Sequence, residues 1–290
     1  MTHEEERVWE APDGTKLFYR LWRAQSPRDA LLLVHGLGSN STRWLEFAGH
    51  TTLSEHWDLV APDLRGHGRS LSRRRGGLSE WTSDLAGILD SAGHQRAVVA
   101  GHSLGALVAL AFARRYPDRT RGLVLIEPSF PQAFGRRGRV LRRCRPLLML
   151  AAGVVRALNA LGLHRRILPY RDLRALDERA RALLGAGKQE EMVRLYGSVW
   201  RDLRFNHTAN YLDDFIAQVG PVPPLEEIQA SVLSLISRDS PFTASAQTEN
   251  VLASLPHNRT VRLPATHWIL TETPGEARRV IEEWVSSRVL

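Results

Sequence analysis

Short apolar runs that alternate with amphipathic stretches are the feature of this sequence that most constrains its fold. Seven runs have the length and composition of strands, at residues 15–23, 30–34, 57–61, 96–100, 122–126, 231–236 and 259–263. Helical periodicity follows several of them, at residues 79–92, 104–116, 244–255 and 275–289. Strands that are apolar along their whole length are typical of a parallel sheet covered on both faces. We therefore expect an α/β fold with a mostly parallel central sheet and helices on both faces, in which the alternating run at 15–23 is half exposed.

The composition is that of a globular protein and excludes several other classes. The only cysteine, Cys144, cannot form an internal disulfide, and the acidic start MTHEEERVWE does not resemble a secretion signal. We therefore expect a cytoplasmic protein. The net charge of +8 belongs to one segment, because residues 128–220 contain 17 basic and 8 acidic residues. None of the usual nucleic-acid-binding motifs accompanies this charge, so we expect no nucleic-acid partner.

The sequence Gly-His-Ser-Leu-Gly directly follows the strand expected at residues 96–100 and precedes an apolar helix. A serine at such a sharp strand-to-helix turn exposes its hydroxyl above the sheet, and the glycines two residues before and after it leave room for the turn. The first amides of the helix also favour negative charge nearby. A helix-capping serine in a glycine-rich turn is the alternative. The placement between strand and helix favours Ser103 as a nucleophile.

Four further motifs follow expected strands. They are HGLG at residues 35–38, DLRGHGRS at 63–70, SRDSP at 237–241, and THW at 266–268 followed by ETP at 272–274. With GHSLG, and in this order, they make the chain resemble the α/β-hydrolases of the serine esterase and lipase type. The resemblance implies a core domain of residues 1–127 and 221–290, with a helical cap inserted at 128–220. It also implies an oxyanion hole formed by the backbone N–H groups of Leu37 and Leu104.

A serine nucleophile needs a general base, because an alcohol is almost wholly protonated near neutral pH. His267 follows the last expected strand and therefore reaches the same edge of the sheet as Ser103. His35, His67 and His102 lie inside motifs in which the resemblance implies structural duties. We therefore expect His267 to be the base, although Thr266 stands before it where relatives commonly have glycine.

The third member of a triad is an acid that orients the histidine. Asp239 follows the strand expected at 231–236 and lies 28 residues before His267, close to the arrangement that the resemblance implies. An aspartate before Ser-Pro is also common in turns. Glu127, at the end of the strand expected at 122–126, is the rival, because some members of the fold carry the acid after that strand. We expect Asp239 to be the acid.

These residues predict acyl transfer through an acyl-enzyme. The expected substrate is a small-molecule carboxylic ester, and a serine at 103 argues against the epoxide-hydrolase and haloalkane-dehalogenase branches, which need a carboxylate there. A thioesterase or acyltransferase, a hydrolase of carbon–carbon bonds and a non-catalytic ligand receptor stay open. Neither a metal-ligand cluster nor a phosphate-binding loop suggests a metal or a cofactor.

The basic segment has its own pattern. It contains no acidic residue from 132 to 170, and an apolar run at 147–163 is flanked by arginines. On a helix, Arg145, Ala152, Arg156 and Asn159 fall on one stripe, opposite a wide apolar face. We expect this face to pack on the core. It could instead lie on an anionic membrane or line an acyl-binding cleft, which would favour large apolar substrates that are anionic or presented on an anionic surface.

Overall fold

The computed structural model describes residues 3–238, 240 and 243–288, and it confirms the α/β fold. Eight strands form one sheet in the order β1-β2-β4-β3-β5-β6-β7-β8, and the strands from β4 to β8 in this order pair in parallel. Their bounds are β1 (Glu4–Glu10), β2 (Lys16–Trp22), β3 (Asp29–Val34), β4 (Trp57–Pro62), β5 (Ala97–His102), β6 (Thr120–Ile126), β7 (Val232–Ser237) and β8 (Asn258–Leu263).

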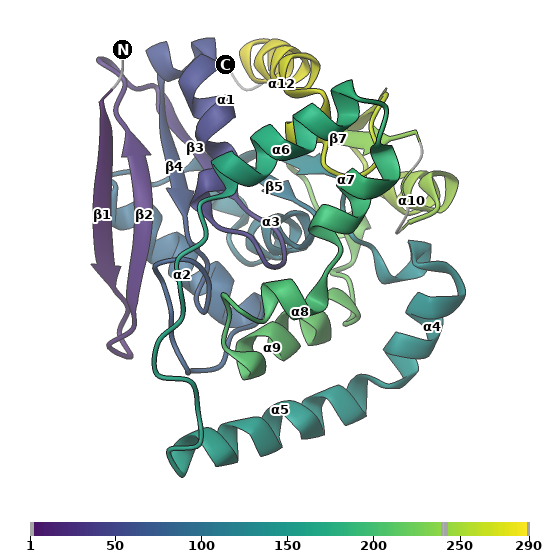
Figure 1. Ribbon diagram of the computed structural model, residues 1–290. Coiled ribbons are helices and arrows are strands. Elements are labelled where there is room, and N and C mark those ends of the chain that lie inside the picture. Colours follow the sequence, from purple (N-terminus) through teal and green to yellow (C-terminus); the bar gives the residue numbers. More distant parts are fainter. Residues whose placement is uncertain (1–2, 239, 241–242, 289–290) are drawn as a thin grey trace.

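Helices cover both faces of this sheet (Figure 1). Alternate residues of β3 point to opposite faces, so Leu32 packs in one apolar core and Leu33 in the other. α2 and α3 supply much of the first core, whereas Trp284 of α12 belongs to the second. The helices outside the β6–β7 segment are α1 (Leu45–His50), α2 (Leu78–Ser91), α3 (Leu104–Arg115), α10 (Ser245–Leu252), α11 (Ile269–Glu272) and α12 (Pro274–Arg288).

Two features of the sheet's first strands differ from the sequence expectation. β1 was not expected, because it is rich in glutamate, but it pairs antiparallel with β2 along its whole length. β2 is buried from residue 17 onward rather than half exposed. The reason is that its polar position is covered: Arg20 pairs with Glu4 of β1, and Arg69 stacks over the Phe18 ring at 3.9 Å. A charged residue can thus occupy a buried face when a neighbouring strand supplies its partner.

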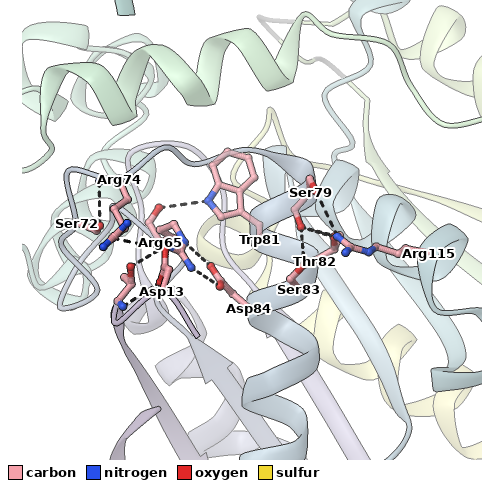
Figure 2. Close-up of polar contacts among 11 residues, drawn as sticks. Asp13, Arg65, Ser72, Arg74, Ser79, Trp81, Thr82, Ser83, Asp84 and Arg115 are labelled. Carbon is pink, nitrogen blue, oxygen red and sulfur yellow. Dashed lines mark hydrogen bonds and ion pairs between the residues drawn. The ribbon is translucent and has the colours of Figure 1, made fainter. Parts of the chain in front are cut away.

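The loop after β4 is held in place by a buried arginine (Figure 2). The Arg65 guanidinium donates to both carboxylate oxygens of Asp84, at 2.8 and 2.7 Å, and to Asp13 at 2.6 Å. The Trp81 indole N–H donates to the Arg65 carbonyl at 3.3 Å. Because the Arg65 guanidinium contacts both oxygens of the Asp84 carboxylate, this contact fixes the orientation of the two groups as well as the distance between them. The DLRGHGRS loop is therefore tied to α2 and to the turn between β1 and β2.

The segment between β6 and β7 forms α4 (Gly135–Arg143), α5 (Arg145–Ala160), α6 (Leu173–Gly185), α7 (Gln189–Tyr196), α8 (Val199–Asp202) and α9 (Thr208–Gln218). Buried ion pairs join it to the rest of the protein. Arg43 lies 2.5 Å from Asp177 of α6, and His67 lies 3.0 Å from Asp214 of α9. Arg43 also donates to Thr271 at 2.7 Å. α6 is thus linked to the loop after β3 and to α11 near the edge of the sheet.

α5 overturns the expectation that its apolar face packs on the core. Ala152, from the stripe opposite that face, is buried at 1% exposure, whereas Leu150 is 66% exposed. α5 packs against α9 along the outer edge of the molecule, away from the sheet (Figure 1). The reason is a buried acid of α9. Asp213 pairs with Arg156, and this ion pair keeps the polar stripe of α5 turned toward the protein.

Candidate active site

Ser103 occupies the turn between β5 and α3 in a strained backbone conformation. Its φ of 56° lies in a region that side-chain-bearing residues rarely adopt. The neighbouring glycines make this turn sterically feasible: a Cβ on Gly101 would lie 2.2 Å from the Gly105 carbonyl oxygen, and one on Gly105 would lie 2.4 Å from the Val34 carbonyl oxygen. The turn therefore brings β3, β5 and α3 into backbone contact around the serine.

The structure brings His267 to Ser103, as the order of the strands predicts. His267 follows β8, and its Nε2 lies 3.2 Å from Ser103 Oγ. On the other side of the ring, Nδ1 lies 3.1 Å from Glu127 Oε2. All three residues are buried, at 4% to 7% exposure. A hydroxyl, an imidazole and a carboxylate are thus connected in the order that nucleophilic catalysis requires.

The carboxylate determines the tautomer of the imidazole. An ionised carboxylate can only accept a hydrogen bond, so the proton of His267 lies on Nδ1, and Nε2 presents its lone pair to the Ser103 hydroxyl. Glu127 follows β6 with a φ of 47°, and its Oε1 accepts the backbone N–H of Ser237 at the end of β7. The rival acid from the sequence is therefore in contact with the base, whereas Asp239 lies outside the described residues and remains a prediction.

The other motif histidines lie in structural positions. His35 Nε2 accepts the Leu64 N–H at 2.9 Å, and burial lowers its pKa well below the ordinary value. Burial does the same for His102, whose Nε2 donates to the His267 carbonyl oxygen at 3.1 Å. Burial disfavours charge on His67 also, but the adjacent Asp214 outweighs it and raises the net pKa. These rings hold loops together around the site.

Glu272 supports the loop of His267, a role that its place in the ETP motif did not predict. Its carboxylate accepts the Thr266 N–H at 2.9 Å and the Thr266 hydroxyl at 2.7 Å. It also accepts the N–H groups of His267, at 3.2 Å, and Trp268, at 2.9 Å. The unusual Thr266 thus contributes a side-chain hydrogen bond that glycine could not make. An acid five residues after a candidate base is the signal that could have indicated this contact.

A cavity of about 60 Å³ adjoins the Ser103 hydroxyl. Its lining mixes the HGLG loop, the site residues and the β6–β7 segment: Gly36, Leu37, Gly38, Ser39, Arg43, His102, Ser103, Arg171, Leu173, Tyr196, Asp202, His267 and Trp268. Leu37 therefore lies at the cavity, and Leu104, the first residue of α3, directly follows Ser103.

Aromatic and charged residues close the cavity on the side of the β6–β7 segment. Tyr196 of α7 stacks on Trp268 with ring centroids 4.7 Å apart. Burial raises the pKa of Tyr196 to about 12, so its hydroxyl stays protonated and donates to Asp177 at 2.5 Å. Arg171 pairs with Asp202 at 2.7 Å beside Gly38. This side of the cavity is therefore formed by two stacked aromatic rings and by the ion pair between Arg171 and Asp202.

Comparisons with known proteins agree with the α/β fold. Residues 31–280 match the Alpha/beta hydrolase family. A 2-hydroxy-6-oxo-2,4-heptadienoate hydrolase from Pseudomonas putida is 40% identical over 100 residues, which are 33% of this chain and 36% of that protein. Lipase LipV from Mycobacterium tuberculosis is 36% identical over 99 residues, 34% of this chain and 37% of that protein. The chain thus matches about a third of the length of these curated relatives.

A solved hydrolase structure from Pseudomonas aeruginosa is similar to the whole chain. Its TM-score is 0.69 at 23% sequence identity, with 98% of this chain and 99% of the other chain covered. At 23% sequence identity, this similarity shows a shared fold and nothing about the substrate.

Proposed function

The chain belongs to the alpha/beta hydrolase family, and we propose that it is a serine hydrolase that cleaves carboxylic esters through Ser103, His267 and Glu127. The observation that carries the proposal is the unbroken hydrogen-bonded series from the Ser103 hydroxyl through His267 to Glu127. Removing a proton from a serine hydroxyl requires a base within hydrogen-bond reach, and Nε2 satisfies this at 3.2 Å. Burial of all three groups excludes most competing water from the proton path.

In the proposed reaction, Ser103 Oγ attacks the ester carbonyl carbon while His267 Nε2 takes the hydroxyl proton. The tetrahedral intermediate then breaks its bond to the alcohol oxygen, and the imidazolium returns the proton to the departing alcohol. Water attacks the resulting acyl-enzyme, giving its proton to Nε2, and the carboxylic acid leaves as Ser103 Oγ is protonated again. Glu127 keeps Nδ1 protonated throughout and stabilises the positive imidazolium.

The backbone N–H groups of Leu37 and Leu104 are proposed as the donors to the negative oxygen of the intermediate. Leu104 begins α3, a 12-residue helix whose first amides carry partial positive charge toward that oxygen. Leu37 lines the cavity from the opposite loop. Apolar side chains are compatible with this role because the donors belong to the backbone.

The cavity favours an ester with a small acyl group. A space of about 60 Å³ holds about four water-sized groups. Among the described residues that line it, none comes from α5, so the apolar face of that helix does not provide an acyl-binding wall. We therefore propose a small acyl group in place of the large apolar one that the sequence suggested. We propose that residues 128–220 act as a cap whose α6–α8 region sets the size of the acyl pocket.

Hydrolysis of a carbon–carbon bond is the second candidate. It is supported by the relative named as a 2-hydroxy-6-oxo-2,4-heptadienoate hydrolase and by the charged residues in the cavity wall. In this candidate the same serine, histidine and acid act on a ketone carbonyl. Thioester hydrolysis and acyl transfer stay open as further alternatives, since both also proceed through an acyl-enzyme.

The decisive experiment replaces the nucleophile. Ser103→Ala should lower kcat for p-nitrophenyl acetate by about 10⁶, as loss of the nucleophile does in serine proteases. Ser91→Ala in α2 is the matched control and should leave kcat unchanged. A fluorophosphonate probe should label the wild type at Ser103, detected by peptide mass spectrometry, and should not label Ser103→Ala. Retention of more than about a hundredth of the wild-type kcat by the folded variant would exclude the proposed mechanism. Measuring kcat/KM for a 2-hydroxy-6-oxo dienoate beside kcat/KM for the acetate ester would show which of the two candidate functions is favoured.

A further inference from the structure

α5 is oriented with its polar stripe toward the protein. Arg156 pairs with Asp213 of α9, and Arg145 Nε donates to the Ile216 carbonyl at 3.3 Å. Asp213 is 4% exposed and also accepts the Gly76 N–H at 3.0 Å. Rotating α5 to bury its leucines would leave this buried carboxylate without its arginine, which is costly. The contacts with α9 therefore fix the outward direction of the apolar face.

The exposed side of α5 is a continuous apolar stripe. Leucines and valines recur at helical spacing along its 16 residues, which span about 24 Å. We call this set the α5 stripe: Leu147 (64% exposed), Leu150 (66%), Val154 (52%) and Leu158 (41%), together with Leu161 (77%) directly after the helix. Ile167, in the chain that follows, is 87% exposed. Soluble proteins rarely expose so long an apolar surface without a binding role.

Arginines lie before and after the α5 stripe. Arg139, Arg142 and Arg143 of α4 precede it and are exposed, and Arg165 and Arg166 follow it. Within the described part of the chain, none of these five forms an ion pair, although Arg165 donates to two backbone carbonyls. No acidic residue occurs between positions 132 and 170. The apolar surface is thus framed by positive charge that the protein itself does not neutralise.

We propose that the α5 stripe and its flanking arginines dock the protein on the surface of an anionic lipid bilayer. A helix with an apolar face and arginines around it binds such a surface by inserting the face at the headgroup boundary while the guanidinium groups meet lipid phosphates. A second copy of the chain is disfavoured as the occupant, because it would bring two acid-free, arginine-rich surfaces together. The helix lies on the bilayer, and no helix of the described residues is long and apolar enough to cross one. Docking is independent of catalysis at Ser103.

The test is sedimentation of the full-length protein with sucrose-loaded vesicles of phosphatidylcholine alone or with 30% phosphatidylglycerol. The apolar variant is Leu150→Asn with Leu158→Asn, and its control is Trp200→Asn, at a residue of α8 that is more exposed than either leucine. The charge variant is Arg142→Gln with Arg143→Gln, and its control is Arg96→Gln with Arg259→Gln, both exposed and distant in sequence. Hydrolysis of a soluble acetate ester checks that every variant is folded.

The wild type should bind the anionic vesicles at least tenfold more tightly than the neutral ones, and less tightly as salt increases. Each arginine near such a surface contributes about fivefold in affinity, so the charge variant should bind roughly twenty-five times more weakly. The apolar variant should lose at least tenfold, and both controls should bind as the wild type does. Equal binding to neutral and anionic vesicles, or no binding at 1 mM lipid, would overturn the proposal. So would a dimer in sedimentation velocity that the leucine substitutions abolish, because the stripe would then join two copies.

Discussion

The Nδ1 atom of His267 lies 3.1 Å from Glu127 Oε2, so a carboxylate that follows β6 faces the candidate base across the edge of the sheet. Glu127 is itself fixed by the Ser237 N–H, which β7 supplies. Two neighbouring strands thus position one acid, and this position gives the imidazole the tautomer that can accept the serine proton.

The first prediction concerns this acid. Glu127→Gln should lower kcat for a short ester by about 10⁴, because the amide can donate to Nδ1 and so stabilise the tautomer that protonates Nε2. Steady-state hydrolysis, with circular dichroism to verify folding, measures the effect. Asp239→Asn is the companion variant, since the sequence favoured that residue. If Asp239→Asn loses more activity than Glu127→Gln in folded protein, the role belongs to Asp239.

The sequence indicated Ser103 and His267 as candidate nucleophile and candidate base because their signals are local. Ser103 is marked by glycines two residues to each side, and His267 by its place after the last strand. The choice of acid is harder, since β6 and β7 are adjacent parallel strands whose carboxyl ends meet at one edge. What turns Glu127 toward the ring is a φ of 47°, which sequence patterns do not predict for a glutamate.

The difference between local sequence signals and long-range contacts also explains which parts of the fold were predictable. Apolar strands and amphipathic helices were predictable from periodicity, whereas β1 was missed because an edge strand with exposed glutamates lacks that pattern. In α5 the periodicity correctly divided the helix into two faces. It could not say which one points inward, because that depends on Asp213, 57 residues after Arg156.

The second prediction concerns Glu272, a positioning residue. Glu272→Gln replaces one acceptor oxygen by an amide NH₂ that faces backbone N–H groups, so the loop of His267 should shift. We expect kcat to fall between about fivefold and about 160-fold with KM nearly unchanged, the range that about one to three kcal/mol implies.

The kcat and KM of a short ester measure the effect, and Glu276→Gln, in the exposed first turn of α12, is the control. A purely structural role would lower the melting temperature while the remaining folded enzyme kept its full kcat. That result would contradict positioning by Glu272.

The third prediction follows from cavity size. With about 60 Å³ beside Ser103, p-nitrophenyl acetate should have a kcat/KM at least tenfold above that of the decanoate. Tyr196→Ala should lower this acetate-to-decanoate ratio. The ring that stacks on Trp268 forms part of the cavity wall, so its removal makes room for a longer acyl chain. Tyr170→Ala, a partly exposed tyrosine that does not line the cavity, is the control. A wild-type preference for the decanoate would show that the cap opens during catalysis and that the closed cavity does not set specificity.

The fourth prediction concerns stability against pH. Burial, aided by nearby positive groups, holds the pKa of His35 and of His102 well below the ordinary value. In the unfolded chain both rings take up protons near pH 6.5, so below that pH the unfolded state binds more protons than the folded state. The free energy of unfolding should therefore fall as pH decreases from about 6.5, by up to about 1.4 kcal/mol per pH unit for each ring. His67 has a raised pKa, so its contribution is complete below pH 6.5 and is lost only as pH rises.

Urea unfolding between about pH 5.5 and 7.5 measures this slope, and His35→Gln isolates one ring. The glutamine oxygen can still accept the Leu64 N–H, but the side chain does not titrate. The variant loses the imidazole and its Nδ1 contact with the Gly36 carbonyl, so it should be less stable than the wild type near pH 7.5. It should lose less stability on acidification, because its slope lacks the contribution of the ring, about half a proton at pH 6.5 and about one proton well below that pH. Comparing slopes removes the contribution of buried carboxyls such as Asp63, whose pKa is raised by burial and which titrate alike in both proteins. Equal slopes in the two proteins would mean that His35 gains a proton without unfolding, and the neutral ring inferred from its hydrogen bond to Leu64 would then be wrong.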